Sequence, residues 1–438
     1  MSSPRPVPDA AEPDIAALIA ARPHLTMHAH DGLLLEGVPL ARIARELGTP
    51  AWVYGAGVMR ARLAALSAAM APVGAQVHYA VKANDHLAVL RLMRTGGAGA
   101  DVVSAGELLR ARQAGIAAAH IVFSGVGKTA EEIRLALAED IAQINVESPA
   151  ELAMIAAIAS SMGRRARVAL RINPDVDAGT HAKITTGRAD NKFGIAYADA
   201  AGLYAHAAGL AGVEPVGLAL HIGSQILAMA PYRAAYARAG ELVRGLRAQG
   251  LAVRRMDCGG GLGIGYGDEA GASPAAFAGA LRAAFDGMDL ELMVEPGRWL
   301  VGPAGLLLAS VVLTKGRFLV LDAAMNDLVR PAMYEAWHGI VPISASHAVA
   351  APGPFDVVGP VCESSDTFAR GRALPPLPDG ACVAILDAGA YGAVMSSTYN
   401  ARPLAPIALV DGDRWAVIRP RQSHAELWAG ERVPDFIG

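Results

Sequence analysis

Hydrophobic and polar positions alternate in blocks along most of this chain. From residue 77 onward, a short apolar run is followed by a polar or glycine turn, an amphipathic segment and a glycine stop, and this unit then repeats. Short apolar runs bounded by turn residues predict buried strands, and apolar positions three and four residues apart predict helices. The predicted strands are 77–81, 99–103, 119–123, 141–146, 166–172, 213–222, 252–257 and 291–295. The predicted helices between them include 105–113, 130–139, 150–161, 232–248 and 274–285.

This alternation predicts a parallel sheet of the α/β class, because strand–helix–strand units place their helices on the faces of the sheet. Eight units within about 250 residues match the size of a (β/α)8 TIM-type barrel. A doubly wound open sheet is the competing arrangement, and periodicity alone does not separate the two. Polar residues at the carboxyl ends of the strands favour the barrel, since a barrel brings those ends to one rim. These residues include Lys82, Asp101, Ser104, Ser124, Glu147, Arg171, Asn173, His221 and Glu295.

The pattern changes beyond residue 303. The strand-like runs 306–313, 318–322, 355–358, 381–386 and 414–418 are separated by proline, glycine and aspartate instead of helices. This predicts a second, mostly β unit with antiparallel strands, in which 370–380 is a proline-rich surface loop. We therefore expect an N-terminal segment at 1–50 that is partly frayed and contributes to the β unit, a barrel domain at 51–303 and a C-terminal β domain at 304–438.

Composition narrows the class of protein. Hydrophobic residues make up 53% of the chain and charged residues 18%, which is enough apolar material for a large core. A formal net charge of −3 supplies no basic field, so nucleic acid is not the expected partner. No apolar stretch has the length of a membrane span, and residues 1–13 lack the features of a secretory signal. The cysteines Cys258, Cys362 and Cys382 are too few and too scattered for a disulfide framework or a zinc site, so a cytoplasmic location is expected.

Lys82 gives the first indication of chemistry, because it closes the apolar strand 77–81. A lysine in that position either extends its amine to solvent or has a function. Buried amines lose their charge readily, and a neutral amine can form a Schiff base with an aldehyde cofactor. Taken alone, Lys82 is explained more simply as an ordinary strand-end lysine, so the interpretation depends on the other motifs.

Two motifs follow the sixth and seventh predicted strands. The three consecutive glycines Gly259, Gly260 and Gly261 let backbone N–H groups turn toward an anion with no Cβ in the way, and barrels commonly bind phosphate at this position. A tight turn would need the same glycines. His221 ends the sixth strand without a second ligand at metal-binding spacing, which argues against zinc. Its ring could stack on a cofactor, with Ser224 reaching a phosphate, or it could be a hydrogen-bonded core histidine.

The third and fourth motifs carry carboxylates. Glu295 follows the last predicted strand, where it could bind a metal, act as a general base or pair with a ring N–H. A surface ion pair with Arg298 is the plainer alternative, and Arg298 could instead bind a carboxylate with both arms of its guanidinium. Cys362 lies beside Glu363 in a loop of the β unit. Its thiol could be inert filling or, next to charged groups, could give or take a proton.

Taken together, these motifs resemble the diaminopimelate decarboxylase family, pyridoxal-phosphate enzymes with an alanine-racemase-like barrel and a C-terminal β domain. The resemblance runs from about residue 33 to residue 434, nearly the whole chain. Each motif alone is modestly specific, but all of them occur in the order of the family. They are 79–84, 101–107, 180–194, 221–225, 259–263, 295–298, 325–331, 359–363 and 388–392.

The resemblance implies pyridoxal 5′-phosphate as the cofactor and assigns roles to individual residues. Lys82 would hold the cofactor aldehyde, His221 would stack on its ring and Glu295 would bind its nitrogen. Cys362 would be the proton donor, and Cys362 and Glu363 would reach the active site of a partner subunit, which implies a homodimer. The other implied cofactor contacts are Asp101, Ser224, Gly259, Gly260, Gly261, Pro296, Gly297, Arg298 and Tyr391. The implied substrate contacts are Arg298, Arg330, Tyr334, Glu363 and Tyr391.

The activity implied by the resemblance is decarboxylation of meso-2,6-diaminopimelate to L-lysine and CO2, the last step of lysine biosynthesis. Arg298 and Arg330 suit the carboxylate at the far end of that substrate, and Glu363 suits its ammonium group. Two alternatives stay open. One is a decarboxylase of ornithine, arginine or another basic amino acid, whose substrate has no distal carboxylate. The other is a catalytically inactive paralogue that acts as a binding protein.

Overall fold

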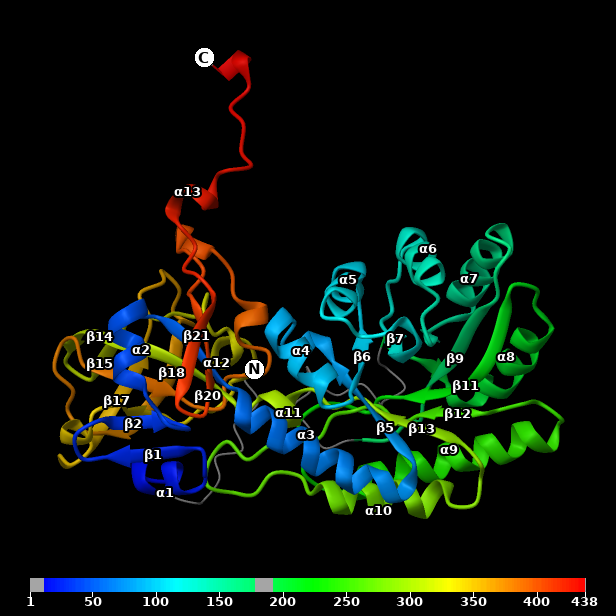
Figure 1. Cartoon of the computed structure of the whole chain (residues 1–438), viewed down its shortest axis with the longest axis horizontal. Coiled ribbons are helices and arrows are strands. Elements are labelled where there is room, and N and C mark those ends of the chain that lie inside the picture. The colour runs from blue at the N-terminus through cyan, green and yellow to red at the C-terminus, as the bar shows by residue number, and fades with distance from the viewer. Residues whose placement is uncertain (1–11, 178–191, 438) are drawn as a thin grey trace.

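The computed structural model describes residues 12–177 and 192–437, which contain a barrel of eight parallel strands (Figure 1). Each strand pairs with the next, and β13 pairs back with β5 where Leu292 lies opposite Ala75, so the ring is closed. The predicted barrel is confirmed, and the open sheet is not formed. The strands of the ring are β5 (Ala75–Ala80), β6 (Gly99–Val102), β7 (Ile121–Phe123), β8 (Gln143–Val146), β9 (Ala166–Asn173), β11 (Val213–Leu220), β12 (Arg255–Asp257) and β13 (Glu291–Val294).

Helices follow the barrel strands and bury their apolar faces against the ring. Their starts are set by local sequence, because Ser104, Thr129 and Ser148 each accept a hydrogen bond from the backbone N–H three residues further on. At Thr129 the bond is reciprocated by Glu132 in a capping box. The helices are α3 (Ala56–Met70), α4 (Leu87–Thr95), α5 (Ala105–Gln113), α6 (Ala130–Glu139), α7 (Pro149–Ser161), α8 (Tyr197–Gly209), α9 (Ala230–Ala248) and α10 (Pro274–Phe285).

A second sheet lies at the other end of the molecule, on the left in Figure 1. Its strands run in the order β18-β17-β15-β14-β4-β20-β21, and β19 pairs with both β14 and β16. Most of these pairings are antiparallel, as predicted, but β15–β17 and β20–β4 are parallel. The strands are β4 (Ala51–Gly55), β14 (Gly305–Lys315), β15 (Phe318–Leu321), β16 (Ile340–Pro342), β17 (Gly353–Val358), β18 (Thr367–Leu374), β19 (Cys382–Ile385), β20 (Ile407–Asp411) and β21 (Arg414–Arg419).

Two details of the second sheet differ from the expectation. Strand β18 occupies part of the predicted loop 370–380, because buried Phe368 and Leu374 flank exposed Arg370 and pair the segment with β17. Strand β4, which the predicted range 51–303 places with the barrel, pairs instead with β14 and β20. The division into 1–50, 51–303 and 304–438 stays a prediction.

The N-terminal segment packs against the second sheet. Its buried Leu35 and Ile43 share an apolar cluster with Leu306 and Val410 of that sheet. The segment contains α1 (Ile15–Ala20), β1 (Leu25–His28), β2 (Gly32–Leu35), β3 (Val38–Pro39) and α2 (Leu40–Leu47). The remaining short elements are β10 (Ile195–Ala196), α11 (Arg298–Val301), α12 (Arg330–Tyr334) and α13 (His424–Leu427), and the chain after α13 extends away from the body (Figure 1).

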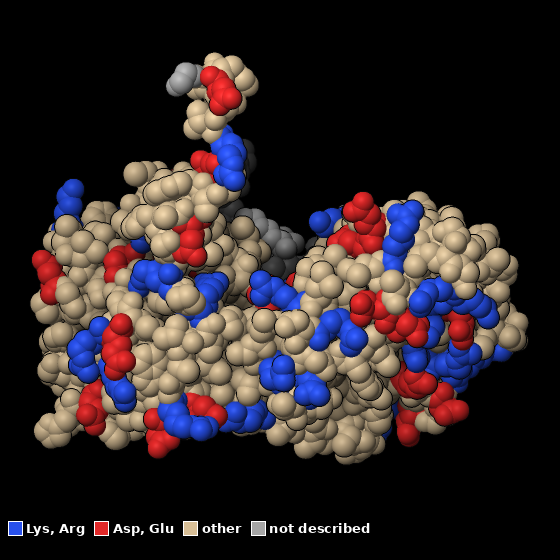
Figure 2. All heavy atoms as spheres, turned by 45° about the horizontal axis from the view of Figure 1, so that its top comes forward, with Lys and Arg blue, Asp and Glu red and all other residues tan. Residues whose placement is uncertain are grey.

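Most of the 180–194 motif, including Asn191, lies outside the described residues. Within the described ranges, no helix combines the length and the apolar character that crossing a lipid bilayer requires. Figure 2 shows basic and acidic side chains interspersed over one face of the molecule, in keeping with the small net charge.

Candidate active site

Lys82 lies at the barrel rim, in a single helical turn directly after β5, and pairs with a buried carboxylate. Its Nζ is 2.8 Å from Oδ2 of Asp101, which ends the neighbouring strand β6. The turn is fixed by the Tyr79 hydroxyl, which donates to the carbonyl of Asn84 at 2.9 Å. Burial disfavours the ammonium form most strongly, but Asp101, Tyr391 and Glu295 together outweigh burial and hold the pKa of Lys82 above its ordinary value. The direction of this shift favours the charged amine while Asp101 is its partner.

The three glycines sit where the chain after β12 passes between the ends of β11 and β13. A Cβ at Gly259 would lie 2.2 Å from the carbonyl oxygen of Leu220, and one at Gly260 would lie 1.9 Å from that of Glu295. Gly259 and Gly261 also have positive φ angles, of 67° and 93°. Close approach of three backbones therefore requires glycine here whether or not an anion binds, and at partly exposed Gly261 the lack of a Cβ leaves room for one.

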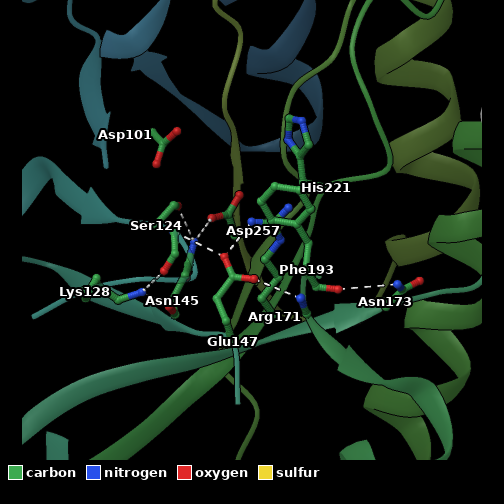
Figure 3. A network of polar contacts seen from close by, with 12 residues as sticks. Asp101, Ser124, Lys128, Asn145, Glu147, Arg171, Asn173, Phe193, His221 and Asp257 are labelled. Carbon is green, nitrogen blue, oxygen red and sulfur yellow. Dashed lines mark hydrogen bonds and ion pairs between the residues drawn. The ribbon is translucent and has the colours of Figure 1, made fainter. Parts of the chain in front are cut away.

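Glu295, directly after β13, shares a buried polar network with residues from three other strands. Ser124 Oγ donates to its Oε1 at 3.4 Å. Asn145 Nδ2 donates to Ser124 Oγ at 3.1 Å and to Asp257 Oδ2 at 2.9 Å (Figure 3). Asp257 in turn accepts the backbone N–H of Gly259 at 3.0 Å. Burial raises the pKa of Glu295 well above its ordinary value, and the Asp101 and Asp257 carboxylates raise it further.

Because its pKa is raised, the Glu295 carboxylate is stabilised by taking up a proton or by a cation beside it. His221 Nδ1 lies 4.0 Å from Glu295 Oε2 and faces the backbone N–H of Gly260 at 3.4 Å. Burial lowers the pKa of His221 well below its usual value, and the positive charges of Arg171 and Lys82 lower it further, so the imidazole is neutral. A neutral flat ring beside an acid with a raised pKa suits a protonated heteroaromatic ring.

Two further ion pairs, both nearly buried, stabilise the loops at the barrel rim. Arg171 on β9 donates to Glu147 after β8 at 2.6 Å (Figure 3). Lys128 pairs with Glu151 at 2.8 Å. Glu147 also accepts the backbone N–H of Gly194 at 2.8 Å. Each of these charged groups is nearly buried and paired, so they hold the rim loops in place instead of forming a further open site.

Arg298 and Arg330 place two buried guanidinium groups on the same side of the site. Arg298 Nη1 donates to the Tyr266 hydroxyl at 2.6 Å, and Nη2 donates to Ser224 Oγ at 3.2 Å. The Arg298 guanidinium lies 4.9 Å from the ring centre of Tyr391, whose backbone N–H donates to the carbonyl of Ala83 next to Lys82. The Arg330 guanidinium lies 5.0 Å from the ring centre of Tyr266. Lys82, the glycine turn and the two arginines Arg298 and Arg330 therefore belong to one contiguous site.

The remaining predicted residues lie at the edge of this group. Tyr334 ends α12 and is partly exposed. Cys362 and Glu363 are exposed in the loop between β17 and β18, where Glu363 Oε1 accepts from the Tyr399 hydroxyl at 2.7 Å. Within the described ranges, no hydrogen bond or ion pair joins either residue to Lys82.

Comparison with known proteins decides the family. Residues 57–302 match the family model described as "Pyridoxal-dependent decarboxylase, pyridoxal binding domain". The diaminopimelate decarboxylases of Zymomonas mobilis and Pseudomonas aeruginosa are each 45% identical to the chain, cover 92% of it and are themselves covered to 98% and 97%. The chain belongs to the diaminopimelate decarboxylase family. The predictions of family, enzyme class and pyridoxal phosphate as cofactor are thereby confirmed.

Solved structures agree with the diaminopimelate decarboxylase assignment. The Helicobacter pylori diaminopimelate decarboxylase complexed with L-lysine is 40% identical, with a TM-score of 0.86 over 89% of this chain and 98% of that chain. The diaminopimelate decarboxylase of M. jannaschii in co-complex with L-lysine is 34% identical, with a TM-score of 0.90 over 95% of this chain and 100% of that chain. A Vibrio vulnificus lysine/ornithine decarboxylase, at 23% identity and a TM-score of 0.75, shares the fold.

Sequence reasoning missed four residues of this diaminopimelate decarboxylase family site. Asn145 and Asp257 are polar positions within buried strands, and Asp257 directly precedes the glycine motif, so both offered a usable signal. Tyr266 and His338 lie in irregular segments outside the predicted strands and motifs. No local pattern in the sequence pointed to these two.

Proposed function

We infer that this chain uses pyridoxal 5′-phosphate to decarboxylate meso-2,6-diaminopimelate to L-lysine and CO2, the last step of lysine biosynthesis. The observation that supports this substrate best is the pair of buried guanidinium groups of Arg298 and Arg330. Among the described residues neither has a carboxylate partner in an ion pair, and two uncompensated buried charges call for an anion. The substrates of diamine-forming decarboxylases have no carboxylate at that end.

The residues present fit pyridoxal phosphate. When bound, its ring withdraws electrons and stabilises the negative charge left at the substrate Cα after CO2 departs. Lys82 would hold the aldehyde, neutral His221 would lie on the ring, and Glu295, whose pKa is raised, would bind the protonated ring nitrogen. Asp101, hydrogen-bonded to Lys82 Nζ, would take the proton that the amine must lose before it can react with a carbonyl carbon.

The phosphate would lie at the glycine turn. The backbone N–H of Gly261 would donate to it, together with the hydroxyls of Ser224 and Tyr391. Gly259 and Gly260, whose N–H groups point to Asp257 and His221, would shape the turn around the phosphate. The segment Pro296, Gly297 and Arg298 would line the same end of the cofactor. Gly297 supports this placement, because a Cβ there would lie 3.0 Å from the Ala83 side chain and 3.4 Å from the Tyr391 hydroxyl.

A homodimer would complete the site. Arg298, Arg330 and Tyr334 would bind the distal carboxylate of the substrate, while Glu363 from the partner subunit would bind its ammonium group and Cys362 from the same subunit would give the proton to Cα. The exposure of both residues on one face of a single chain supports this arrangement. The three free thiols support a reducing, cytoplasmic location.

Mixed dimers test the shared site. We expect Lys82→Ala and Cys362→Ala to be inactive separately and to regain part of the wild-type activity when they are unfolded together and refolded as a mixture, since one site of each mixed dimer would then be intact. No recovery in a mixture that forms dimers would contradict a site shared between subunits.

Substrate choice tests the function itself. CO2 release should be measured with meso-diaminopimelate, its LL isomer, lysine and ornithine, with Lys82→Ala as the inactive control. We expect rapid release from the meso isomer alone and none from the variant. Faster release from ornithine or lysine, or full activity of Lys82→Ala, would refute the proposed function.

A further inference from the structure

The buried imidazole of His338 is held in one tautomer between two fixed partners. Its Nδ1 is 2.7 Å from the carbonyl oxygen of Leu386, and its Nε2 is 2.7 Å from Nη1 of Arg330. A carbonyl oxygen only accepts, so Nδ1 must carry the hydrogen. In the neutral ring Nε2 is then an acceptor, and it receives an N–H of Arg330. A doubly protonated ring would place two donors against each other at that contact.

Surrounding groups reinforce the neutral form. His338 is 1% exposed, and burial lowers its pKa well below the usual value, with the nearby Arg330, Arg298 and Arg372 guanidinium groups adding to the effect. Its ring also packs edge-on against Tyr266, with the ring centres 5.2 Å apart. Contacts with Leu386, Arg330 and Tyr266 therefore fix the position of the imidazole.

Arg330 depends on this imidazole for its orientation. Its guanidinium is 5% exposed, lies over the Tyr266 ring at 5.0 Å and makes no ion pair with a carboxylate in the described part of the chain. Arg330 Nη1 donates its hydrogen bond to His338 Nε2, and Arg330 Nε has no hydrogen-bond partner. The neutral imidazole fixes the Nη1 end of the Arg330 guanidinium and leaves its positive charge uncompensated. A carboxylate in the same place would neutralise that charge.

We propose that His338 is a positioning residue that sets the Arg330 guanidinium for the distal carboxylate of the substrate and thereby contributes to selectivity for substrates that carry this group. The inference rests on the proposed function. It predicts an effect confined to ligands with the carboxylate, because among the described residues no hydrogen bond or ion pair joins this pair to Lys82, Glu295 or the glycine turn.

Two substitutions separate the two nitrogens of the ring. In His338→Asn the side-chain amide can keep the donor to Leu386 but offers no acceptor at the Nε2 position, whereas His338→Gln can return an oxygen acceptor there. His206→Asn, an exposed position on α8, is the matched control. Two ligands of the same chain length separate the roles of the substrate groups, since L-lysine retains the distal carboxylate and cadaverine lacks it.

The measurement is the dissociation constant of each ligand for the holoenzyme by titration calorimetry, together with kcat and KM for meso-diaminopimelate. A hydrogen bond to a charged group corresponds to about a tenfold change in affinity. We expect His338→Asn to raise the KM and the dissociation constant of L-lysine about tenfold, with cadaverine binding and kcat changed less than about twofold. His338→Gln should recover most of the loss, and His206→Asn should match wild type.

Three outcomes would overturn the proposal. Equal weakening of L-lysine and cadaverine would indicate a purely structural histidine, unchanged L-lysine binding in His338→Asn would show that Arg330 needs no such support, and failure of the Gln variant to recover would remove the role of the Nε2 acceptor. A wild-type enzyme that does not decarboxylate meso-diaminopimelate would instead refute the proposed function, so the two failures are distinct.

Discussion

Gly260→Ala is a severe test of the site, because the glycine turn and Glu295 meet there through their backbones. The added Cβ would lie 1.9 Å from the Glu295 carbonyl oxygen and 2.8 Å from its carbonyl carbon. The turn and the end of β13 must therefore separate by about 1 Å before the contact becomes tolerable. Both the glycine turn, where the phosphate is proposed to bind, and the Glu295 carboxyl group would move together.

The magnitude follows from two effects. Forcing an extra methyl group into a close-packed site costs about 1–3 kcal/mol of unfolding free energy. A displacement of about 1 Å in a catalytic arrangement costs roughly a hundredfold in rate. We therefore expect Gly260→Ala to lower the free energy of unfolding by about 2 kcal/mol, to weaken cofactor binding and to lower kcat roughly a hundredfold.

Gly279→Ala is the matched control. Gly279 is exposed within α10, and a Cβ there would have no heavy atom within 4 Å. Alanine in an exposed helix interior should stabilise the protein by about 0.5–1 kcal/mol and leave kcat unchanged. Denaturant unfolding, equilibrium titration of the apoenzyme with pyridoxal phosphate and initial rates measure the three quantities. If the two variants behaved alike, the backbone contact between the turn and Glu295 would not constrain the site.

Three further predictions concern buried charge. Asp387→Ala should destabilise the protein by about 3–5 kcal/mol in denaturant unfolding because it leaves Arg22 buried and unpaired. Glu46→Ala, at an exposed position on α2, should cost less than about 0.5 kcal/mol, and similar losses in the two variants would contradict this. Burial lowers the pKa of His78 from 6.5 to about 4, so the unfolded state binds this proton more tightly and folding stability falls as the pH drops between those values. Relative to His78→Gln, wild type should lose about 3 kcal/mol more from pH 7 to pH 4, and parallel pH–stability curves would refute it. Arg298→Lys should raise KM for meso-diaminopimelate, because a point charge does not reproduce the guanidinium fork; an unchanged kcat/KM would exclude that role.

The barrel was predictable because its strands are short apolar runs with distinct ends. The run 99–103 corresponds to β6, and 166–172 lies within β9. Once parallel neighbours are assumed, residues at the carboxyl ends of the strands are expected at one rim. Lys82 and Asp101 illustrate this, since they lie 2.8 Å apart. Strand β18 was not predicted, because Arg370, Gly371 and the prolines that follow read as a loop, and only pairing with β17 makes the segment a strand.

Arg298 and Arg330 differ in how far their surroundings could be predicted from the sequence pattern. Arg298 follows the last barrel strand, and its neighbourhood can be inferred from the ring, but Arg330 comes from a short helix beside the second sheet. Its partner His338 depends on the carbonyl of Leu386, at the end of a strand nearly fifty residues further along the chain. No local pattern encodes a hydrogen bond at that separation.

The proposed roles divide largely between the barrel and the second sheet, with Arg298 after β13 assigned to both cofactor and substrate. The barrel supplies Lys82, the glycine turn and Glu295, the groups suited to grip a cofactor, and all of them are fixed by closely packed strand ends. The second sheet and its connections supply Arg330 and His338, which are suited to reading the far end of a substrate. Because the two sets come from different elements, changes around Arg330 can alter substrate choice while the strand ends that hold the cofactor groups keep their positions. Relatives that act on substrates without a distal carboxylate are therefore expected to differ from this chain mainly around the second set.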